Sequence, residues 1–155
     1  QSRGYQVTAL ENSPGCVQVM KKSGVKDVIE ADFFKHSGKY DPILLLMNGL
    51  GLAGKLDGVP KLLKKCKSLL TPDGQILVDS SDIKYLYEGK VPTSSYYGEV
   101  SYRYQYGKET GDWFDWVYVD QQKLQEIVNS VDMSVEILFT DENDQYLACI
   151  TSETK

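Results

Sequence analysis

The sequence predicts an α/β fold in which a mostly parallel sheet gives way to antiparallel hairpins toward the C-terminal end. The apolar run Ile43 to Met47 is too short and too continuous for an amphipathic helix, so we expect a strand covered on both faces. Ile76 to Val78 has the same character. Apolar residues between the two runs recur at three- and four-residue spacing, which is typical of a helix with one buried side. This order predicts a right-handed crossover between parallel strands.

The helix between these two strands has an apolar side and a basic side. Its lysines are expected to face solvent, and they are Lys61, Lys64, Lys65 and Lys67. The residues that we expect to be buried are Val59, Leu62, Leu63, Cys66, Leu69 and Leu70.

Length and composition fit one domain and exclude several classes of protein. The chain has 155 residues, of which 41% are apolar and 25% charged, so we expect a single domain over residues 1–155. No apolar run approaches the roughly 20 residues that span a bilayer, and no secretory leader is recognisable, which predicts a soluble, cytoplasmic protein without membrane partners. A net charge of −5 gives no broad basic surface for nucleic acid. A small-molecule substrate fits better.

The three cysteines stand singly in apolar-patterned stretches of the chain. Cys16, Cys66 and Cys149 have neither the paired spacing of a zinc site nor an even number for a disulfide framework. We therefore expect reduced thiols in the core.

Two acidic residues follow the first two predicted strands. Glu11 stands just past the strand Tyr5 to Leu10, and Asp32 just past the strand Asp27 to Ala31. Open α/β sheets bind ligands beyond the carboxyl ends of their strands, so both carboxylates are expected to point at one crevice. There one carboxylate can accept hydrogen bonds from ribose hydroxyls, and another from an adenine amino group. The alternative, a solvated loop charge at Glu11 and a turn former at Asp32, stays open.

The remaining elements follow from caps and alternation. Ser13 and Pro14 predict the start of a helix that ends before Gly24. Ser80-Ser81-Asp82 predicts the cap of a short helix, although this cluster also stands at the crevice end of a strand. Strict alternation predicts an aromatic hairpin at about residues 98–119, which is either ordinary sheet packing or a wall for an acceptor substrate. Asp120 then caps a helix, and a second hairpin closes the chain.

Four segments of the chain, taken in order, resemble class I S-adenosylmethionine-dependent methyltransferases from their second strand onward. They read V-T-A-L-E-N-S-P, V-I-E-A-D-F-F, Y-D-P-I-L-L-L-M-N-G-L-G and L-L-K-K-C-K-S-L-L-T-P-D-G-Q-I-L-V-D. The resemblance covers residues 4–82 well and the remainder in outline. It implies a Rossmann-like sheet with an antiparallel C-terminal hairpin, and the hairpin at about 98–119 would be an insertion.

The resemblance also implies a cofactor site. S-adenosyl-L-methionine would be held through its ribose by Glu11, with Asn12 beside it, and through its adenine by Asp32 and Phe33. Met47-Asn48-Gly49 would line the methyl-transfer crevice, with Asn48 as a candidate for orienting the acceptor. The Asn-Pro-Pro-Tyr signature for amino groups of bases or glutamine is absent, which argues against nucleic-acid amine methylation.

One feature of that family is missing from the chain. Its first strand carries an acidic, glycine-rich turn around the methionine part of the cofactor, and neither Gly49-Leu50-Gly51 nor Gly107 to Gly111 occupies that position. The resemblance therefore implies a C-terminal portion of a longer methyltransferase that lacks the first strand and is inactive alone. The strands around Val7 and Leu45 would lose their common neighbour, so we expect them to pair directly or to self-associate with another chain.

Two other classes of protein stay open. A fragment of an NAD(P)-dependent oxidoreductase would share the sheet and the ribose carboxylate, but it needs G-x-G-x-x-G after its first strand. A noncatalytic interaction module is the third possibility. His36, the single histidine, lies in a polar loop and is not expected to act as a catalytic base.

Overall fold

The computed structural model describes residues 1–152. The chain divides into two compact units, Gln1–Gly38 and Lys39–Lys155, and each is described by itself. No helix among residues 1–152 is long and apolar enough to cross a membrane.

The first unit is a small parallel β-α-β arrangement. Its elements are β1 (Thr8–Glu11), α1 (Pro14–Lys22) and β2 (Asp27–Glu30). The two strands pair in parallel, with Thr8 opposite Asp27 and Glu11 opposite Glu30. The predicted helix start is confirmed, because Ser13 Oγ accepts a hydrogen bond from the Cys16 N–H at 3.5 Å and Pro14 is the first helical residue. The predicted strand bounds were shifted, since β1 begins at Thr8 and includes Glu11.

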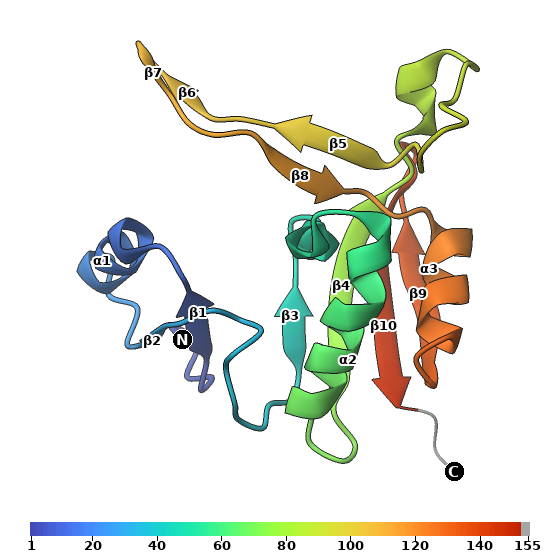
Figure 1. Cartoon of the computed structure of the whole chain (residues 1–155). Coiled ribbons are helices and arrows are strands. Elements are labelled where there is room, and N and C mark those ends of the chain that lie inside the picture. The colour runs from blue at the N-terminus through green and yellow to red at the C-terminus, as the bar shows by residue number, and fades with distance from the viewer. Residues whose placement is uncertain (153–155) are drawn as a thin grey trace. The chain divides into compact units, whose positions relative to one another are not determined.

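The second unit is built on a four-stranded sheet in the order β3-β4-β10-β9 (Figure 1). β3 and β4 pair in parallel, whereas β10 is antiparallel to both of its neighbours. The strands are β3 (Ile43–Leu45), β4 (Gln75–Ser81), β5 (Glu99–Tyr102), β6 (Gln105–Tyr106), β7 (Glu109–Thr110), β8 (Phe114–Val117), β9 (Met133–Thr140) and β10 (Gln145–Ser152). The helices are η1 (Gly49–Ala53), η2 (Leu56–Gly58), α2 (Val59–Leu69), η3 (Lys84–Tyr87) and α3 (Gln121–Asn129), where η marks a 3₁₀ helix.

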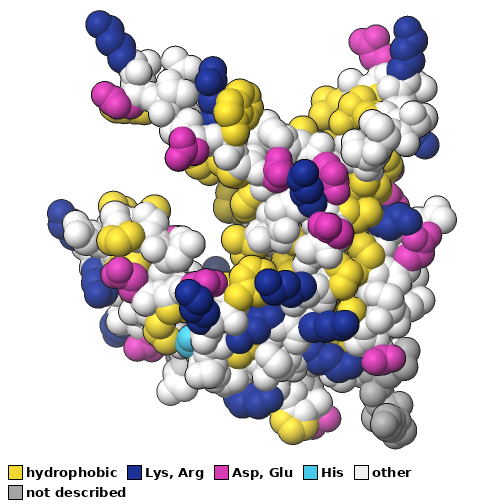
Figure 2. Space-filling model, in the orientation of Figure 1, with side chains coloured by type: hydrophobic (Ala, Val, Ile, Leu, Met, Phe, Trp, Pro, Cys, Tyr) yellow, Lys and Arg dark blue, Asp and Glu magenta, His cyan; other side chains and the backbone are white. Residues whose placement is uncertain are grey.

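Helix α2 confirms the predicted apolar stripe. All six residues expected to be buried, from Val59 to Leu70, are at most 4% exposed. Figure 2 shows Lys and Arg side chains gathered over the outer surface where Figure 1 places α2. One of these lysines reaches the turn between α3 and β9, because Lys67 Nζ donates to the carbonyl oxygens of Val131 and Asp132 at 3.0 and 2.8 Å. The strand-helix-strand unit predicted at 43–78 is therefore present, with its strands parallel.

Two burial predictions were wrong. The strand at 43–47 was expected to be covered on both faces, but Leu44 and Leu46 are 52% and 47% exposed while Leu45 is buried. The reason is that, within the second unit, one face of β3 packs on the core at Leu45 while the opposite face is left uncovered. Cys16 was expected in the core, and it lies exposed on α1. Cys66 is buried, Cys149 is half-buried, and all three thiols are free.

The aromatic hairpin at 98–119 is present in the second unit. β5 pairs antiparallel with β8, and the tip continues as the short pair β6–β7, so the strands are more interrupted than strict alternation predicts. The tip extends beyond the rest of the unit (Figure 1). Cross-strand aromatic packing is confirmed, because the rings of Tyr102 and Phe114 lie 6.2 Å apart and those of Tyr104 and Phe114 lie 5.2 Å apart.

The C-terminal elements agree with the sequence. Asp120 Oδ1 accepts a hydrogen bond from the Lys123 N–H at 2.9 Å, which caps α3 as expected. β9 and β10 form the predicted closing hairpin, and its alternation buries Tyr146, Ala148 and Ile150. β10 thus lies between β4 and β9 as an antiparallel strand near the sheet edge.

The strands predicted around Val7 and Leu45 are β1 and β3, and each is paired within its own unit. Among residues 1–152, β1 pairs with β2 in the first unit and β3 pairs with β4 in the second. Within its own unit each strand has one unpaired edge, and the direct pairing of these edges, or their pairing with another chain, stays a prediction.

Candidate functional site

The carboxyl end of the first unit's sheet carries the predicted acidic residues. Glu11 is the last residue of β1 and half-buried, and its Oε1 accepts a hydrogen bond from the Ser13 N–H at 2.8 Å. This bond orders the turn between β1 and α1. Asn12, within that turn, is exposed. The structure thus places a carboxylate at the strand end, with a bond only to its own turn among residues 1–152.

Asp32 also bonds to residues close to it in the sequence. Its Oδ1 accepts a hydrogen bond from the Phe34 N–H at 2.9 Å, and its Oδ2 lies 3.8 Å from Lys35 Nζ in an exposed ion pair. Phe33 is half-buried, with its ring 5.5 Å from that of Phe34 in an edge-to-face arrangement. These local bonds agree with the alternative interpretation of Asp32 as a turn-forming residue. Its assignment to adenine stays a prediction.

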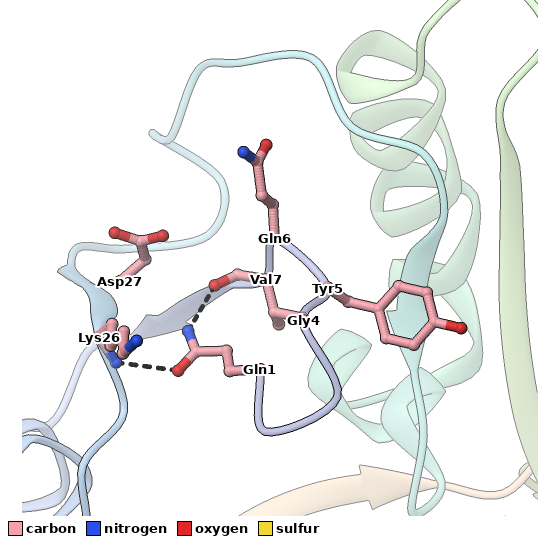
Figure 3. A pocket seen from close by; sticks show the side chains of 7 residues that line it. All are labelled: Gln1, Gly4, Tyr5, Gln6, Val7, Lys26 and Asp27. Atoms are coloured by element: carbon pink, nitrogen blue, oxygen red, sulfur yellow. Dashed lines mark hydrogen bonds between the residues drawn. The ribbon is translucent and has the colours of Figure 1, made fainter.

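A hollow that the sequence did not predict lies at the opposite end of the same two strands. It has a volume of about 220 Å³ and is lined by residues of the first unit that precede β1 or begin β2 (Figure 3). Gln1 crosses it, since Nε2 donates to the Val7 carbonyl at 2.7 Å and Oε1 accepts from the Lys26 N–H at 2.9 Å. The hollow therefore lies at the amino ends of β1 and β2, away from Glu11 and Asp32 at their carboxyl ends.

In the second unit, the backbone turns sharply after β3. Met47 and Asn48 both have left-handed backbone angles, with φ of 58° and 56°, and the 3₁₀ helix η1 starts directly after them. Two successive residues in this region are unusual for non-glycine residues, and such strain often occurs at ligand sites. Met47 is 89% exposed, whereas Asn48 and Gly49 are buried. The structure therefore splits the predicted trio into one exposed and two buried residues.

Asn48 makes hydrogen bonds through every polar group of its side chain. Its Oδ1 accepts from Ser80 Oγ at 2.6 Å, and its Nδ2 donates to the Val117 carbonyl at 3.2 Å. Its backbone N–H donates to Asp79 Oδ1 at 3.2 Å. These bonds tie the turn after β3 to β4 and β8. A direct contact of Asn48 with an acceptor stays a prediction, and the contacts observed favour a structural task.

Of the cluster Ser80-Ser81-Asp82, which was predicted to cap a short helix, Ser80 does not take part in a cap. It is 2% exposed, donates to Asn48 and accepts from the Val119 N–H at 3.0 Å. The turn into η3 is instead made by Asp82, whose Oδ1 accepts from the Lys84 N–H at 2.9 Å. The signal was present in the sequence, because alternation along β4 places Ser80 on the same face as Ile76 and Val78. A serine on a buried face needs a hydrogen-bonding partner.

The base of the hairpin is joined closely to the turn after β3. Gly51 in η1 lies against Trp116 of β8, and a Cβ atom at residue 51 would be 1.9 Å from the indole ring. Glu99 Oε1 accepts from the Leu56 N–H at 2.9 Å. The hairpin is therefore fixed at its base, whereas Tyr106 at its tip is 89% exposed.

A second polar cluster lies around Asp120. Asp120 Oδ2 accepts hydrogen bonds from Tyr96 and Tyr97 at 2.6 and 3.0 Å. Burial opposes the charged form of Asp120, but the bonds from Tyr96, from the Lys123 N–H and from Tyr97 outweigh it and lower its pKa. Burial, followed by the Asp120 carboxylate, raises the pKa of Tyr96. This cluster holds the segment before β5 against the start of α3, and the sequence prediction recognised only its cap.

Three tyrosines lie beside the hairpin base, of which Tyr85 and Tyr102 are exposed and Tyr118 is half-buried. Tyr102 donates to the Tyr118 hydroxyl at 3.3 Å, and Tyr85 is close enough to affect it electrostatically. The bond from Tyr102, then burial, raises the pKa of Tyr118 to about 12. Tyr118 lies between Val117 and Val119, the two residues bonded to Asn48 and Ser80. The Tyr118 hydroxyl is therefore a neutral hydrogen-bonding group at neutral pH.

Comparison with solved structures finds strong similarity to methyltransferases. A SAM-dependent methyltransferase from Bacteroides fragilis in complex with S-adenosyl-L-homocysteine is 38% identical, with a TM-score of 0.89 over 99% of this chain and 66% of that chain. The CcbJ methyltransferase from Streptomyces caelestis has a TM-score of 0.71 at 12% identity, over 99% of this chain and 77% of that one. A DhpI–SAM–HEP complex has a TM-score of 0.70 at 16% identity, over 94% and 67%.

The two weaker identities show a shared fold alone. The chain spans 66% of the length of the Bacteroides fragilis protein. No protein-family model and no curated protein sequence matches the chain.

Proposed function

Because the chain belongs to the class I S-adenosylmethionine-dependent methyltransferases, we propose that it is part of an enzyme that transfers a methyl group from S-adenosyl-L-methionine to a small-molecule acceptor. The observation that carries the proposal is 38% identity, over 99% of this chain, to a methyltransferase in complex with S-adenosyl-L-homocysteine. An oxidoreductase and an interaction module have no comparable support.

Within the first unit, we assign the nucleoside of the cofactor to Glu11, Asn12, Asp32 and Phe33. The chemistry fits, because carboxylates accept hydrogen bonds from ribose hydroxyls and from an adenine amino group, and an aromatic ring can cover the base. The bonds that Glu11 and Asp32 make in the structure are local ones. Local bonds of half-exposed side chains can be exchanged for ligand contacts at little cost to the fold.

Within the second unit, we assign the methyl-transfer crevice to Met47, Asn48 and Gly49. The cofactor supplies an electrophilic methyl group on a sulfonium. The protein's part in such an in-line displacement is to orient the acceptor and exclude water, and a general base is optional. The left-handed backbone at Met47 and Asn48 supports this assignment, since strained backbone gathers at ligand sites. Exposed Tyr85 and Tyr102, with half-buried Tyr118, are candidates for one wall of the acceptor site.

We further propose that the active protein is longer than this chain. The support is the 66% coverage of the Bacteroides fragilis protein, together with the edges that β1 and β3 leave unpaired within their own units. On this proposal the first strand of the family's sheet and its glycine-rich turn are missing, the 98–119 hairpin is an insertion, and the chain alone is inactive. The two bare strand edges are candidate sites of self-association.

The first test is calorimetric titration of S-adenosylhomocysteine into the 155-residue chain and into the longer product of its gene. We expect binding to the longer protein and weak or no binding to the chain alone. Glu11→Ala in the longer protein is expected to weaken binding by about 1 to 3 kcal/mol, the usual cost of losing a charge-assisted bond to a buried group.

Two controls sharpen this titration. Glu30→Ala changes an exposed acidic residue opposite Glu11 in the strand pair and should leave the affinity unchanged. NAD⁺ titrated in place of S-adenosylhomocysteine tests the oxidoreductase alternative. Binding of NAD⁺ would refute S-adenosyl-L-methionine as the cofactor. An unchanged affinity for S-adenosylhomocysteine in Glu11→Ala would refute the assignment of Glu11 to the ribose.

A further inference from the structure

Asn48 and Ser80 are unusual in the second unit because they combine a polar aliphatic side chain with burial. They are 9% and 2% exposed, and no other polar aliphatic or charged residue among residues 1–152 is buried. Buried polar groups lose hydration, so a sequence that keeps two of them in contact does so at a cost that hydrogen bonds must offset. A buried amide and hydroxyl that are fully bonded specify one arrangement of the segments they join.

The segments joined here are the turn after β3 and the base of the hairpin. Ser80, on β4, donates to Asn48 in the turn and accepts from Val119 just after β8. Asn48 completes the link by donating to the Val117 carbonyl at the end of β8. From the other side, Tyr146 donates to the Val119 carbonyl at 2.6 Å. Hydrogen bonds therefore fix the backbone of Val117, the last residue of β8, and of Val119, two residues later.

A steric contact accompanies these polar ones. Trp116 lies against Gly51, three residues after Asn48, with no room for a Cβ atom between them. The turn cannot shift without displacing the indole ring or breaking the bonds of Asn48 to Ser80 and Val117. In contrast, the hairpin tip has no such constraint, because Tyr104 and Tyr106 are 78% and 89% exposed.

We propose that Ser80 and Asn48 are positioning residues that couple the turn Met47–Gly49 to the base of the hairpin, so that the two move as one body. Every polar atom of the two side chains already makes a hydrogen bond within the second unit. We therefore expect their effect on binding to be exerted through the backbone of Met47 and Gly49. The coupling itself does not depend on the proposed function. Its expected effect on cofactor binding does, because the turn Met47–Gly49 is the assigned methyl-transfer crevice.

The coupling is tested in the 155-residue chain by the fluorescence of Trp116. The chain has two tryptophans, so Trp113→Phe leaves Trp116 as the only reporter. In that background we expect Ser80→Ala to raise acrylamide quenching of Trp116 and shift its emission to longer wavelength, in protein that is still folded by circular dichroism. Ser80→Thr keeps the hydroxyl and should restore the original signal. Ser81→Ala, its neighbour on β4, should change nothing.

A second variant guards against loss of folding in Ser80→Ala. Asn48→Asp tolerates the left-handed backbone and can still accept from Ser80, but it cannot donate to the Val117 carbonyl. We expect it to raise the quenching of Trp116 as well. Unchanged quenching in the folded variants would overturn the coupling.

The consequence for binding is measured separately, in the longer gene product. Ser80→Ala should weaken S-adenosylhomocysteine binding about ten-fold, on the scale of one buried hydrogen bond, while Ser81→Ala should not. If the unsubstituted protein binds no S-adenosylhomocysteine but Trp116 responds as expected, the proposed function fails and the coupling stands. If binding is normal in folded Ser80→Ala, the positioning role is refuted.

Discussion

Polar side chains occupy the carboxyl ends of the parallel strands in both units, but they are bonded in opposite ways. Glu11 and Asp32 accept hydrogen bonds from backbone groups two residues further along the chain and remain partly or largely exposed. Asn48 and Ser80 are buried, and their bonds join β3, β4 and β8. The first arrangement leaves side chains that can exchange their bonds for those of a ligand, whereas the second fixes the backbone of the turn after β3.

This difference predicts opposite responses to substitution. Changes in the second unit should alter stability, because each removes or strains a contact between elements that are distant in sequence. Changes at the end of the first unit's sheet should alter stability little and ligand binding much.

The largest effect on stability is expected from Gly51→Ala. The added methyl would lie 1.9 Å from the ring of Trp116, so the indole must move, and such overpacking costs about 2 to 3 kcal/mol. Gly15→Ala in α1 is the matched change in the first unit. There the nearest atom is Ser13 Oγ at 3.9 Å, so alanine should be neutral or stabilising by up to about 1 kcal/mol. Urea unfolding followed by tryptophan fluorescence measures the first variant, and circular dichroism the second. A mild effect of Gly51→Ala would show that the hairpin base is loosely held.

A smaller loss is expected from Tyr146→Phe. The buried hydroxyl donates to the Val119 carbonyl at 2.6 Å, and its removal leaves that carbonyl without this donor, at a cost of about 1 to 2 kcal/mol. Tyr104→Phe on the exposed hairpin is the control and should change the free energy of unfolding by less than about 0.5 kcal/mol. Equal effects of the two substitutions in urea titrations would contradict the distinction between buried and exposed polar groups.

The sequence was sufficient for the parts of the fold that depend on periodicity and caps. The apolar stripe of α2, the caps at Ser13 and Asp120 and the closing hairpin all follow from local residue patterns. It failed where a residue's role depends on its tertiary neighbours. Ser80 could equally cap a helix or bond within the core, and only the positions of Asn48 and Val119 decide between these roles.

Burial at the edge of a sheet was equally hard to predict. The run Ile43 to Met47 has the composition of a central strand, yet within the second unit β3 leaves the face of Leu44 exposed. Composition cannot show which elements cover the two faces of a strand. For the candidate site, sequence placed Glu11 and Asp32 at strand ends, but it could not show that both carboxylates already accept bonds from their own turns.

Asp120 should make the stability of the second unit depend on pH. Its pKa is lowered in the folded state, so the ionised carboxylate stabilises the fold above the unfolded pKa of about 3.9, and this contribution is lost as pH falls through the lower folded pKa. Asn can still cap α3, so Asp120→Asn mainly weakens the bonds from Tyr96 and Tyr97, at a cost of about 1 kcal/mol at pH 7. The difference from the unsubstituted chain, measured by urea unfolding, should shrink below pH 4. A constant difference down to pH 2 would refute the role of the charge.

The smallest effect is expected from Lys35→Ala, which removes the ion pair with Asp32. Both side chains are well exposed, at 85% and 45%, and their charged atoms are 3.8 Å apart, so water and salt screen the attraction. The free energy of opening should change by less than about 0.5 kcal/mol. Hydrogen exchange read by mass spectrometry on peptides from residues 1–38 measures this locally, because both tryptophans lie in the second unit and do not report on the first. Asp32→Asn, which keeps an oxygen that can accept from the Phe34 N–H, serves as the companion variant. A change above about 1 kcal/mol in either would mean that this carboxylate is a structural anchor like Asn48, and that its bonds are not readily exchanged for those of a ligand.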